Sequence, residues 1–280
     1  MSREELETWI KAHPVAGDPG AMREVFEFLT QSRATGDRVC VNDVPGLAFG
    51  AGPPIVWLHG GGYVFGSPHS HAAAASRLAA ITGSRVLVPD YRLAPEHPWP
   101  AALDDACAFV SGCEAPVAIV GDSAGGHLAV NVARRLPSKV HALALISPNT
   151  DRTGLSGTRQ VNTPSDLMNA DEDDARLADM AMGHLFAGSR DVSPIYADLT
   201  MLPPCFVTAS QIEVLYDDAR LLIAALRRQG VAVETAFVSD MFHLWPLWPD
   251  HLVQARRTIA SIAEFVIRQR VAGTERTMAR

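Results

Sequence analysis

The 280-residue chain has little of several features that define other protein classes. Its four cysteines, Cys40, Cys107, Cys113 and Cys205, follow neither a disulfide framework nor the spacing of a metal site. We therefore expect reduced cysteines that pack in apolar surroundings. The net charge is −7 and no basic patch is visible, which argues against nucleic acid as a partner and weakly disfavours anionic substrates.

Long apolar runs are missing as well. No apolar stretch reaches the roughly 20 residues that a membrane-spanning helix needs, so we expect no membrane association. Residues 1–6 (MSREEL) are charged and lack the apolar segment of a signal peptide. Together with the cysteine pattern, these absences predict a cytoplasmic protein.

The chain does contain an alternation of strand-like and helix-like segments. With 48% hydrophobic residues it can form one large core. Strand-like runs such as 117–120 and 140–146 alternate with helix-like segments such as the one that begins near Ala124. This alternation predicts an α/β protein with a mostly parallel central sheet flanked by helices. Residues 39–49, broken at Pro45-Gly46, predict an antiparallel hairpin at the leading edge of the sheet.

Residues 121–125 (GDSAG) fit the pattern G-x-S-x-G and directly follow the apolar run 115–120. A sharp turn from strand to helix crowds the backbone, so the positions two residues to either side of the serine must be small, and both are glycine. Such a turn exposes the hydroxyl of Ser123 at the end of a strand. It also places the amide of Ala124 at the positive end of a helix. We predict Ser123 as a nucleophile and the Ala124 amide as an oxyanion donor.

Three consecutive glycines, residues 60–62, follow the strand-like run 54–58 and His59. Glycine costs chain entropy, so three in a row indicate a backbone that must come close to another group. Attack of a serine on an ester builds negative charge on the carbonyl oxygen, and each preorganised amide aimed at that oxygen stabilises it by roughly 3 kcal/mol. We predict that Gly61, Gly62 and Ala124 form the oxyanion hole. The alternative is a flexible glycine turn.

A serine hydroxyl needs a base, and His243 is the best candidate among the ten histidines. It follows the strand-like run 231–238 by a short turn and precedes the last long helix, so it falls at the carboxyl end of the sheet. The alternative is a packing histidine among apolar neighbours. The pattern around Ser123 favours the catalytic interpretation.

The acid should lie between the serine and the histidine, because hydrolases with this turn have the order serine, acid, histidine. The strand-like run 204–209 is followed by Glu213, Asp217 and Asp218. Asp217 and Asp218 suit the first turn of the next helix, where negative charge is favourable. Glu213 is closest to the strand end and is our first choice, with Asp217 second.

Four segments carry a resemblance to a known family. They are HGGGY at 59–63, YRLAPEHPWPAA at 91–102, GDSAGG at 121–126 and MFH at 241–243. In this order they resemble the hormone-sensitive-lipase-like carboxylesterases of the α/β-hydrolase fold, from about residue 50 to the end. Family members usually carry Asp-Pro-Leu-Arg-Asp around the acid. This chain has Glu-Val-Leu-Tyr-Asp there, so the resemblance assigns the acid to Glu213, with one more methylene.

The resemblance also implies a small helical cap, built from residues 1–35 and from an insertion at about residues 150–197. The catalytic α/β-hydrolase domain is then residues 36–280. Within the insertion, the carboxylates at 171–174 are expected to be the solvated first turn of a helix. The substrate pocket is expected to involve Tyr63, Phe65, Leu167, Met168, Phe186 and Trp245.

Neither a cofactor nor a metal is expected. His69 and His71 have no further ligands at metal spacing. The three prolines within residues 95–100 predict a rigid loop that packs rather than reacts.

The predicted function is hydrolysis of small to medium acyl esters through an acyl-enzyme. A lactone hydrolase or an aryl formamidase would use the same residues. A non-catalytic ligand-binding receptor on this scaffold is the alternative from another class, and the presence of His243 argues against it. The resemblance further implies a homodimer formed through the last strand of the sheet.

Overall fold

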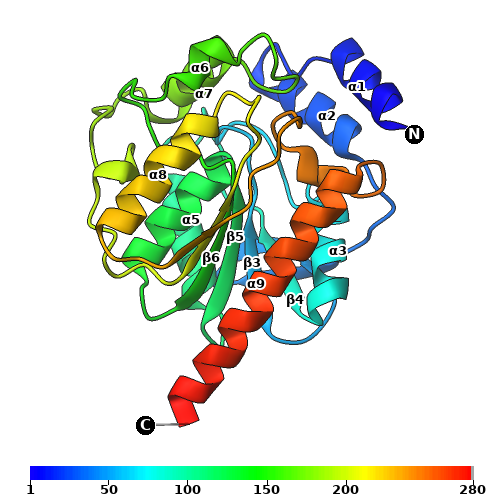
Figure 1. Ribbon diagram of the computed structural model, residues 1–280. Helices are drawn as coiled ribbons and strands as arrows, with labels where there is room; N and C mark the ends of the chain where they lie inside the picture. The colour runs from blue at the N-terminus through cyan, green and yellow to red at the C-terminus, as the bar shows by residue number, and fades with distance from the viewer. Residues whose placement is uncertain (279–280) are drawn as a thin grey trace.

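A central eight-stranded sheet organises the chain (Figure 1). The structure is a computed structural model that describes residues 1–278, with side chains as far as residue 272. The strand order is β1-β2-β4-β3-β5-β6-β7-β8. The strands are β1 (Asp37–Val41), β2 (Val44–Phe49), β3 (Pro54–Leu58), β4 (Arg85–Pro89), β5 (Val117–Asp122), β6 (Val140–Ile146), β7 (Cys205–Thr208) and β8 (Val233–Thr235).

The sheet is mostly parallel, as predicted. Strand β2 pairs antiparallel with both β1 and β4, and the other neighbours run parallel. The strands from β3 to β7 are buried almost throughout, which is why they read as continuous apolar runs in the sequence.

Helices cover both faces of the sheet. Helices α3 and α9 pack against each other on one face, and α4, α5 and α8 cover the other. The helices are α1 (Arg3–Ala12), α2 (Pro19–Thr30), α3 (Ala72–Thr82), α4 (Ala101–Ser111), α5 (Ala124–Arg135), α6 (Thr158–Val161), α7 (Asp171–Met182), α8 (Tyr216–Arg228) and α9 (Val253–Met278), with short 3-10 helices at Pro194–Tyr196 and Trp245–Leu247. Among residues 1–278, no helix combines the length and the apolar character needed to cross a membrane.

The hairpin at the leading edge turns at Asn42-Asp43, so the prediction of a break at Pro45-Gly46 was wrong. Asn42 and Asp43 have φ values of 48° and 65°, which a tight two-residue hairpin turn requires and which Asn and Asp tolerate. Pro45 and Gly46 lie inside β2 instead. A Cβ on Gly46 would lie 2.6 Å from the carbonyl oxygen of Val88, so the glycine allows the close approach of β4.

Two other expectations need correction. The predicted strand at 231–238 is shorter, because β8 covers only Val233–Thr235, and Val238 forms an isolated bridge with Ser210. Cys113 and Cys205 are buried as expected and Cys107 is partly buried, but Cys40 is exposed on β1. Strand β1 lies at the sheet edge, where one face meets solvent.

Helices α1, α2, α6 and α7 lie together at the top of Figure 1, beyond the carboxyl ends of the parallel strands. Hydrogen bonds attach them to the loops at that edge. Arg23 of α2 donates to the carbonyls of Val64 (2.8 Å) and Ala94 (2.9 Å). The carbonyl of Ala181 in α7 accepts from the amide of Trp99 (2.9 Å).

Candidate active site

Ser123 occupies the sharp turn between β5 and α5. Its φ of 54° and ψ of −122° are values that side-chain-bearing residues rarely adopt. The packing explains the flanking glycines: a Cβ on Gly121 would lie 2.4 Å from the carbonyl oxygen of Gly125, and one on Gly125 would lie 2.0 Å from that of Leu58. The strand, turn and helix are those that the G-x-S-x-G pattern predicts.

The glycine loop lies directly against this turn. A Cβ on Gly60 would lie 3.2 Å from the Cβ of Ser123, and the Gly60 amide donates to Oδ2 of Asp122 (3.0 Å). Asp122 also accepts from the indole of Trp57 (2.7 Å) and lies 3.1 Å from Nε2 of His71. Burial works to raise the pKa of Asp122, but the charge and hydrogen bond of His71 and the hydrogen bond of Trp57 lower it below its ordinary value. Asp122 thus ties the glycine loop to the strand that carries Ser123.

Gly61 and Gly62 have positive φ values of 113° and 60°. A Cβ on Gly61 would lie 2.2 Å from the carbonyl oxygen of Phe65, and one on Gly62 would lie 2.7 Å from Cδ1 of Leu177 in α7. Both the backbone conformation and the space therefore require glycine.

His243 and Glu213 form a buried hydrogen-bonded pair. Nδ1 of His243 lies 2.9 Å from Oε2 of Glu213. The other carboxylate oxygen, Oε1, accepts from the hydroxyl of Ser147 (2.6 Å) and the amide of Ser210 (2.8 Å). The carboxylate therefore fixes which imidazole nitrogen carries the proton, and Nε2 is the nitrogen left for chemistry.

The surroundings make His243 a stronger base. Burial works to lower the pKa of His243, but the hydrogen bond with Glu213 and the charges of Glu213, Asp166 and Asp122 raise it above its ordinary value. No hydrogen bond joins the hydroxyl of Ser123 to His243 among the residues described here, and such contacts commonly tighten only when substrate binds.

The second-choice acid points elsewhere. Asp217 pairs with Arg220 (2.7 Å) on the surface of α8, and Asp218 is buried against Arg159. Neither hydrogen bonds to His243, so the carboxylate that reaches the imidazole from this segment is Glu213.

Comparison with known proteins identifies the family. The profile of a family described as having the alpha/beta hydrolase fold matches residues 55–247. The chain belongs to the hormone-sensitive-lipase-like carboxylesterases of the α/β-hydrolase fold. It is 33% identical over 225 residues to an acetyl-hydrolase of Streptomyces hygroscopicus (77% of this chain, 75% of the relative). It is 31% identical over 222 residues to an esterase of Acinetobacter venetianus (75% and 73%).

Solved structures agree with this assignment. A crystal structure of an esterase from the bacterial hormone-sensitive lipase family matches this hydrolase with a TM-score of 0.88 and 30% sequence identity, over 95% of this chain and 97% of that one. The predicted fold class is therefore confirmed, and the chain is a hydrolase.

Sequence reasoning missed two residues beside the pair in this hydrolase. Ser147 lies directly after β6 and holds Glu213. Asp166, partly buried in the loop between α6 and α7, accepts from the amides of Val214 (3.0 Å) and His243 (2.9 Å). No motif marks either residue, because both act through contacts between segments that are distant in the sequence.

The described side chains contain one group able to hold a metal ion, made of Asp166, Glu213 and His243, whose ligand atoms lie within 4.8 Å of one another. A metal there would have to replace the hydrogen bond between Glu213 and His243.

A small cavity of about 10 Å³ adjoins the helix that follows Ser123. Its lining includes Gly62, Tyr63 and Ala124. The hydroxyl of Tyr63 lies 2.6 Å from Nδ1 of His127, one turn along α5. Burial lowers the pKa of His127 to about 4, with the charge of Arg152 acting in the same direction, so this imidazole is neutral near pH 7.

Of the six residues expected around the substrate pocket, Tyr63 lines this cavity. Phe65 packs against Phe26 under the glycine loop. Trp245 is fully buried in the core, where its indole donates to Thr258, and Phe186 is 79% exposed. Leu167 and Met168 are partly buried against the core. Of the six, Tyr63 is therefore the one residue that lines this cavity.

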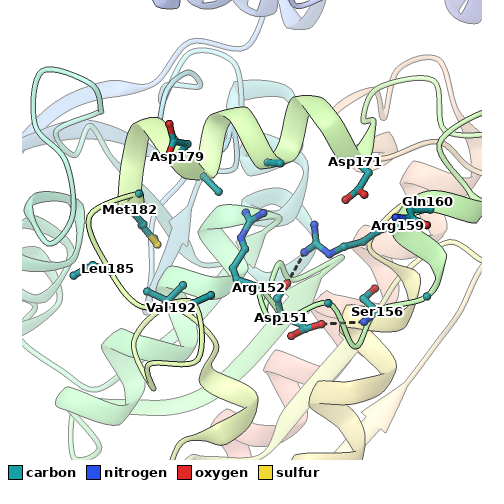
Figure 2. Close-up of a pocket in the computed structure, with 16 residues that line it drawn as sticks. Asp151, Arg152, Ser156, Arg159, Gln160, Asp171, Asp179, Met182, Leu185 and Val192 are labelled. Atoms are coloured by element: carbon teal, nitrogen blue, oxygen red, sulfur yellow. Dashed lines mark hydrogen bonds between the residues drawn. The ribbon is translucent and has the colours of Figure 1, made fainter.

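A larger cavity of about 480 Å³ lies between α7 and the segment 151–160 (Figure 2). Met182, Leu185 and Val192 lie at one end, together with the carboxylate of Asp179, and the other end carries the charged groups of Arg159 and Asp171. Met182 and Val192 also line the small cavity, so the two spaces adjoin.

Ion pairs join two arginines that line the larger cavity, Arg152 and Arg159, to carboxylates of α7 and α8. Asp174 pairs with both Arg152 and Arg159, and Arg159 also pairs with Asp218. Asp174 is only 3% exposed, so the prediction that all of residues 171–174 are solvated was wrong for this residue. Asp174 lies on the same buried face of α7 as Leu177 and Ala181. There it meets the guanidinium groups of Arg152 and Arg159.

Proposed function

We propose that this hydrolase cleaves carboxylic esters through an acyl-enzyme formed on Ser123. The observation that carries the proposal is the hydrogen bond between Glu213 and His243. The pair belongs to loops at the carboxyl ends of the strands, where the glycine loop 60–62 also packs against the turn at Ser123. The relatives named esterase and acetyl-hydrolase support ester hydrolysis.

In the first step, the Ser123 hydroxyl attacks the ester carbonyl carbon while Nε2 of His243 takes its proton. Glu213 keeps the other imidazole proton on Nδ1 and stabilises the imidazolium that forms. The negative charge moves to the carbonyl oxygen, and the amides of Gly61, Gly62 and Ala124 donate to it.

The tetrahedral intermediate then collapses. The imidazolium of His243 gives its proton to the leaving alcohol, and an ester of Ser123 remains. Water then attacks this ester while the same imidazole takes one of its protons. The bond between the acyl carbon and the Ser123 oxygen breaks, the imidazolium returns the proton to that oxygen, and the carboxylic acid leaves. The proposed steps combine nucleophilic catalysis by Ser123, acid–base catalysis by His243 and hydrogen bonds from backbone amides.

We further propose that residues 1–35 and about 150–197 form the cap over this site. The contact of Leu177 with Gly62 supports it, because α7 then lies directly on the proposed oxyanion loop. The small cavity beside Tyr63 and Ala124, about 10 Å³, has room for no more than about one water, whereas the neighbouring cavity of about 480 Å³ leaves room for a small to medium acyl group. A cytoplasmic location and a homodimer stay predictions.

The experiment compares p-nitrophenyl esters of increasing acyl length, with lactones and N-formyl arylamines as parallel substrates. We expect the wild type to release p-nitrophenol from the esters, and we expect kcat to fall at least about a thousandfold in Ser123→Ala. Ser111→Ala, a serine exposed at the end of α4, is the matched control and should retain activity. Absence of hydrolysis by the wild type would favour the receptor alternative, and a preference for lactones or formamides would redefine the substrate.

A further inference from the structure

Side chains from the insertion follow the backbone of the loop that carries Glu213, residues 209–215, which we call the acid loop. Asn162 donates through Nδ2 to the carbonyl oxygens of Gln211 (3.0 Å) and Glu213 (2.9 Å). Ser165 donates to the carbonyl oxygen of Ile212 (2.8 Å). Three successive acid-loop carbonyls thus receive hydrogen bonds from one short segment.

A further residue of the insertion extends this pattern. Thr158 donates to the carbonyl oxygen of Val214 (3.0 Å) and accepts from the amide of Asp217 (2.9 Å). The segment 158–166 therefore contacts the acid loop along its length, and side-chain hydrogen bonds of this kind fix a loop that has no ladder of its own.

Asp166 joins this acid loop to the base loop, which we define as residues 239–244. Its Oδ2 accepts from the amide of Val214 (3.0 Å) and its Oδ1 from the amide of His243 (2.9 Å). Oδ1 also accepts from the amide of Met168 (3.1 Å), which fixes the carboxylate on its own loop. One side chain of the insertion thus holds the two loops that present the acid and the base.

The same carboxylate is a charge close to the imidazole. Its oxygen lies within 4.8 Å of the ligand atoms of Glu213 and His243. The ionisable groups that act on the imidazole are Glu213, Asp166 and Asp122, all negative when ionised. Burial raises the pKa of Asp166 to about 6, opposed by His243 and assisted by Glu213, so the carboxylate is mostly ionised at neutral pH.

We propose that Asp166 is a positioning residue for ester hydrolysis, which clamps the acid loop to the base loop and places a carboxylate beside the imidazole of His243. The inference rests on the proposed function of Ser123, His243 and Glu213. It follows that the 158–166 part of the insertion belongs to the framework of the site, whereas α7 covers it.

The test replaces Asp166 by Asn, which keeps the shape, removes the charge and can accept through only one of its two terminal atoms. We expect kcat to fall about tenfold or more, since hydrogen bonds to charged groups are among the stronger ones, with KM changing less. The acid limb of the pH profile of kcat/KM should move to lower pH. Asp173→Asn, the same change at an exposed position of α7, should match the wild type in both.

A second measurement does not depend on turnover. The imidazole of His243 is titrated by NMR in Ser123→Ala and in Ser123→Ala/Asp166→Asn, with the signal assigned through His243→Ala. We expect a lower pKa in the variant that lacks the carboxylate. An unchanged imidazole pKa together with an unmoved acid limb would overturn the inference even if kcat falls, because a merely loosened loop lowers turnover without moving them.

These results separate the two proposals. If the wild type shows no Ser123-dependent hydrolysis, the proposed function fails, while the NMR comparison still reports on Asp166. If the wild type is active and Asp166→Asn equals it in kcat and in both pH measurements, only the inference about Asp166 fails.

Discussion

The hydroxyl of Ser147 donates a 2.6 Å hydrogen bond to Oε1 of Glu213. Ser147 follows β6 and Glu213 follows β7, so the bond spans two neighbouring strands at their carboxyl ends. With the amide of Ser210 on the same oxygen, Oε1 is held from two sides and Oε2 faces His243. A glutamate, longer than the aspartate usual in this family, is in this way kept in one orientation.

Ser147→Ala should therefore weaken catalysis through the acid. Oε1 of Glu213 would lose one of two donors, and the loss of a hydrogen bond to a charged group predicts a fall in kcat of about tenfold. Steady-state hydrolysis of p-nitrophenyl acetate measures it, with Ser111→Ala as the serine control. Wild-type kcat in Ser147→Ala would contradict this role.

Glu213→Gln should cost far more activity than Asp217→Asn. A neutral amide at position 213 no longer fixes the imidazole tautomer or stabilises the imidazolium, and comparable changes cost about 10⁴-fold in kcat. Asp217 is paired with Arg220 on α8 and should be replaceable with little effect. Measured kcat values in the opposite order would reassign the acid.

The positive φ of Ser123 predicts that Ser123→Gly has a more stable fold than Ser123→Ala. This φ costs about 1–3 kcal/mol for a residue with a Cβ. Ser123→Gly relieves that strain and Ser123→Ala does not, so glycine should be the more stable variant by about 1 kcal/mol after its larger unfolded-state entropy is counted. Urea unfolding of the two inactive variants measures the difference, and equal midpoints would refute the strain.

The pH profile should show the raised pKa of His243. A base must be neutral to accept a proton, so kcat/KM rises with pH as the imidazole loses its proton. Because the pKa of His243 lies above its ordinary value of 6.5, the acid limb should have its midpoint above that pH. Initial rates at substrate concentrations well below KM between about pH 5 and 9 give this midpoint. A midpoint below 6.5 would show that desolvation outweighs the charges of Glu213, Asp166 and Asp122.

Asp174→Asn should destabilise the fold. It removes the shared partner of Arg152 and Arg159, and breaking a buried pair by removing one member costs about 3–5 kcal/mol. Thermal or urea unfolding measures the loss, and Asp173→Asn, exposed one position earlier, should lie within about 0.5 kcal/mol of the wild type. Similar losses in both variants would contradict the network.

The pH dependence of this network has a defined sign. Burial works to raise the pKa of Asp174, but Arg152 and Arg159 hold it well below its ordinary value. A carboxyl group with a depressed pKa stabilises the fold fully above its unfolded pKa of about 3.9, and the contribution is lost as pH falls below that value. The stability difference between wild type and Asp174→Asn should shrink accordingly below about pH 4.

Much of the architecture follows from local sequence signals. The bounds of β3 and β6 coincide with the strand-like runs 54–58 and 140–146, because strands buried on both faces leave few polar positions. The one polar residue in β6, His141, is only partly buried. The turn at Ser123 is equally local, since its steric demand appears as two glycines at fixed spacing.

What sequence reasoning missed depends on contacts between distant segments. Asp174 was expected in solvent because first-turn carboxylates usually are, and only the fold brings Arg152 and Arg159 beneath it. Asp166 and Ser147 carry no motif, and each acquires its place from loops far along the chain. The hairpin was misplaced for another reason: a Pro-Gly pair is a strong turn signal, and here it marks a crowded strand.

The contact between Gly62 and Leu177 has a practical consequence for laboratory evolution. The leucine fills the volume that a side chain at position 62 would occupy, 2.7 Å from where its Cβ would be. Substitutions at position 177 would change how closely α7 packs against Gly62, and with it the position of the loop amides, while every proposed reacting group stays intact. Selectivity between bulky and compact acyl donors could then be altered from a helix that takes no part in bond making.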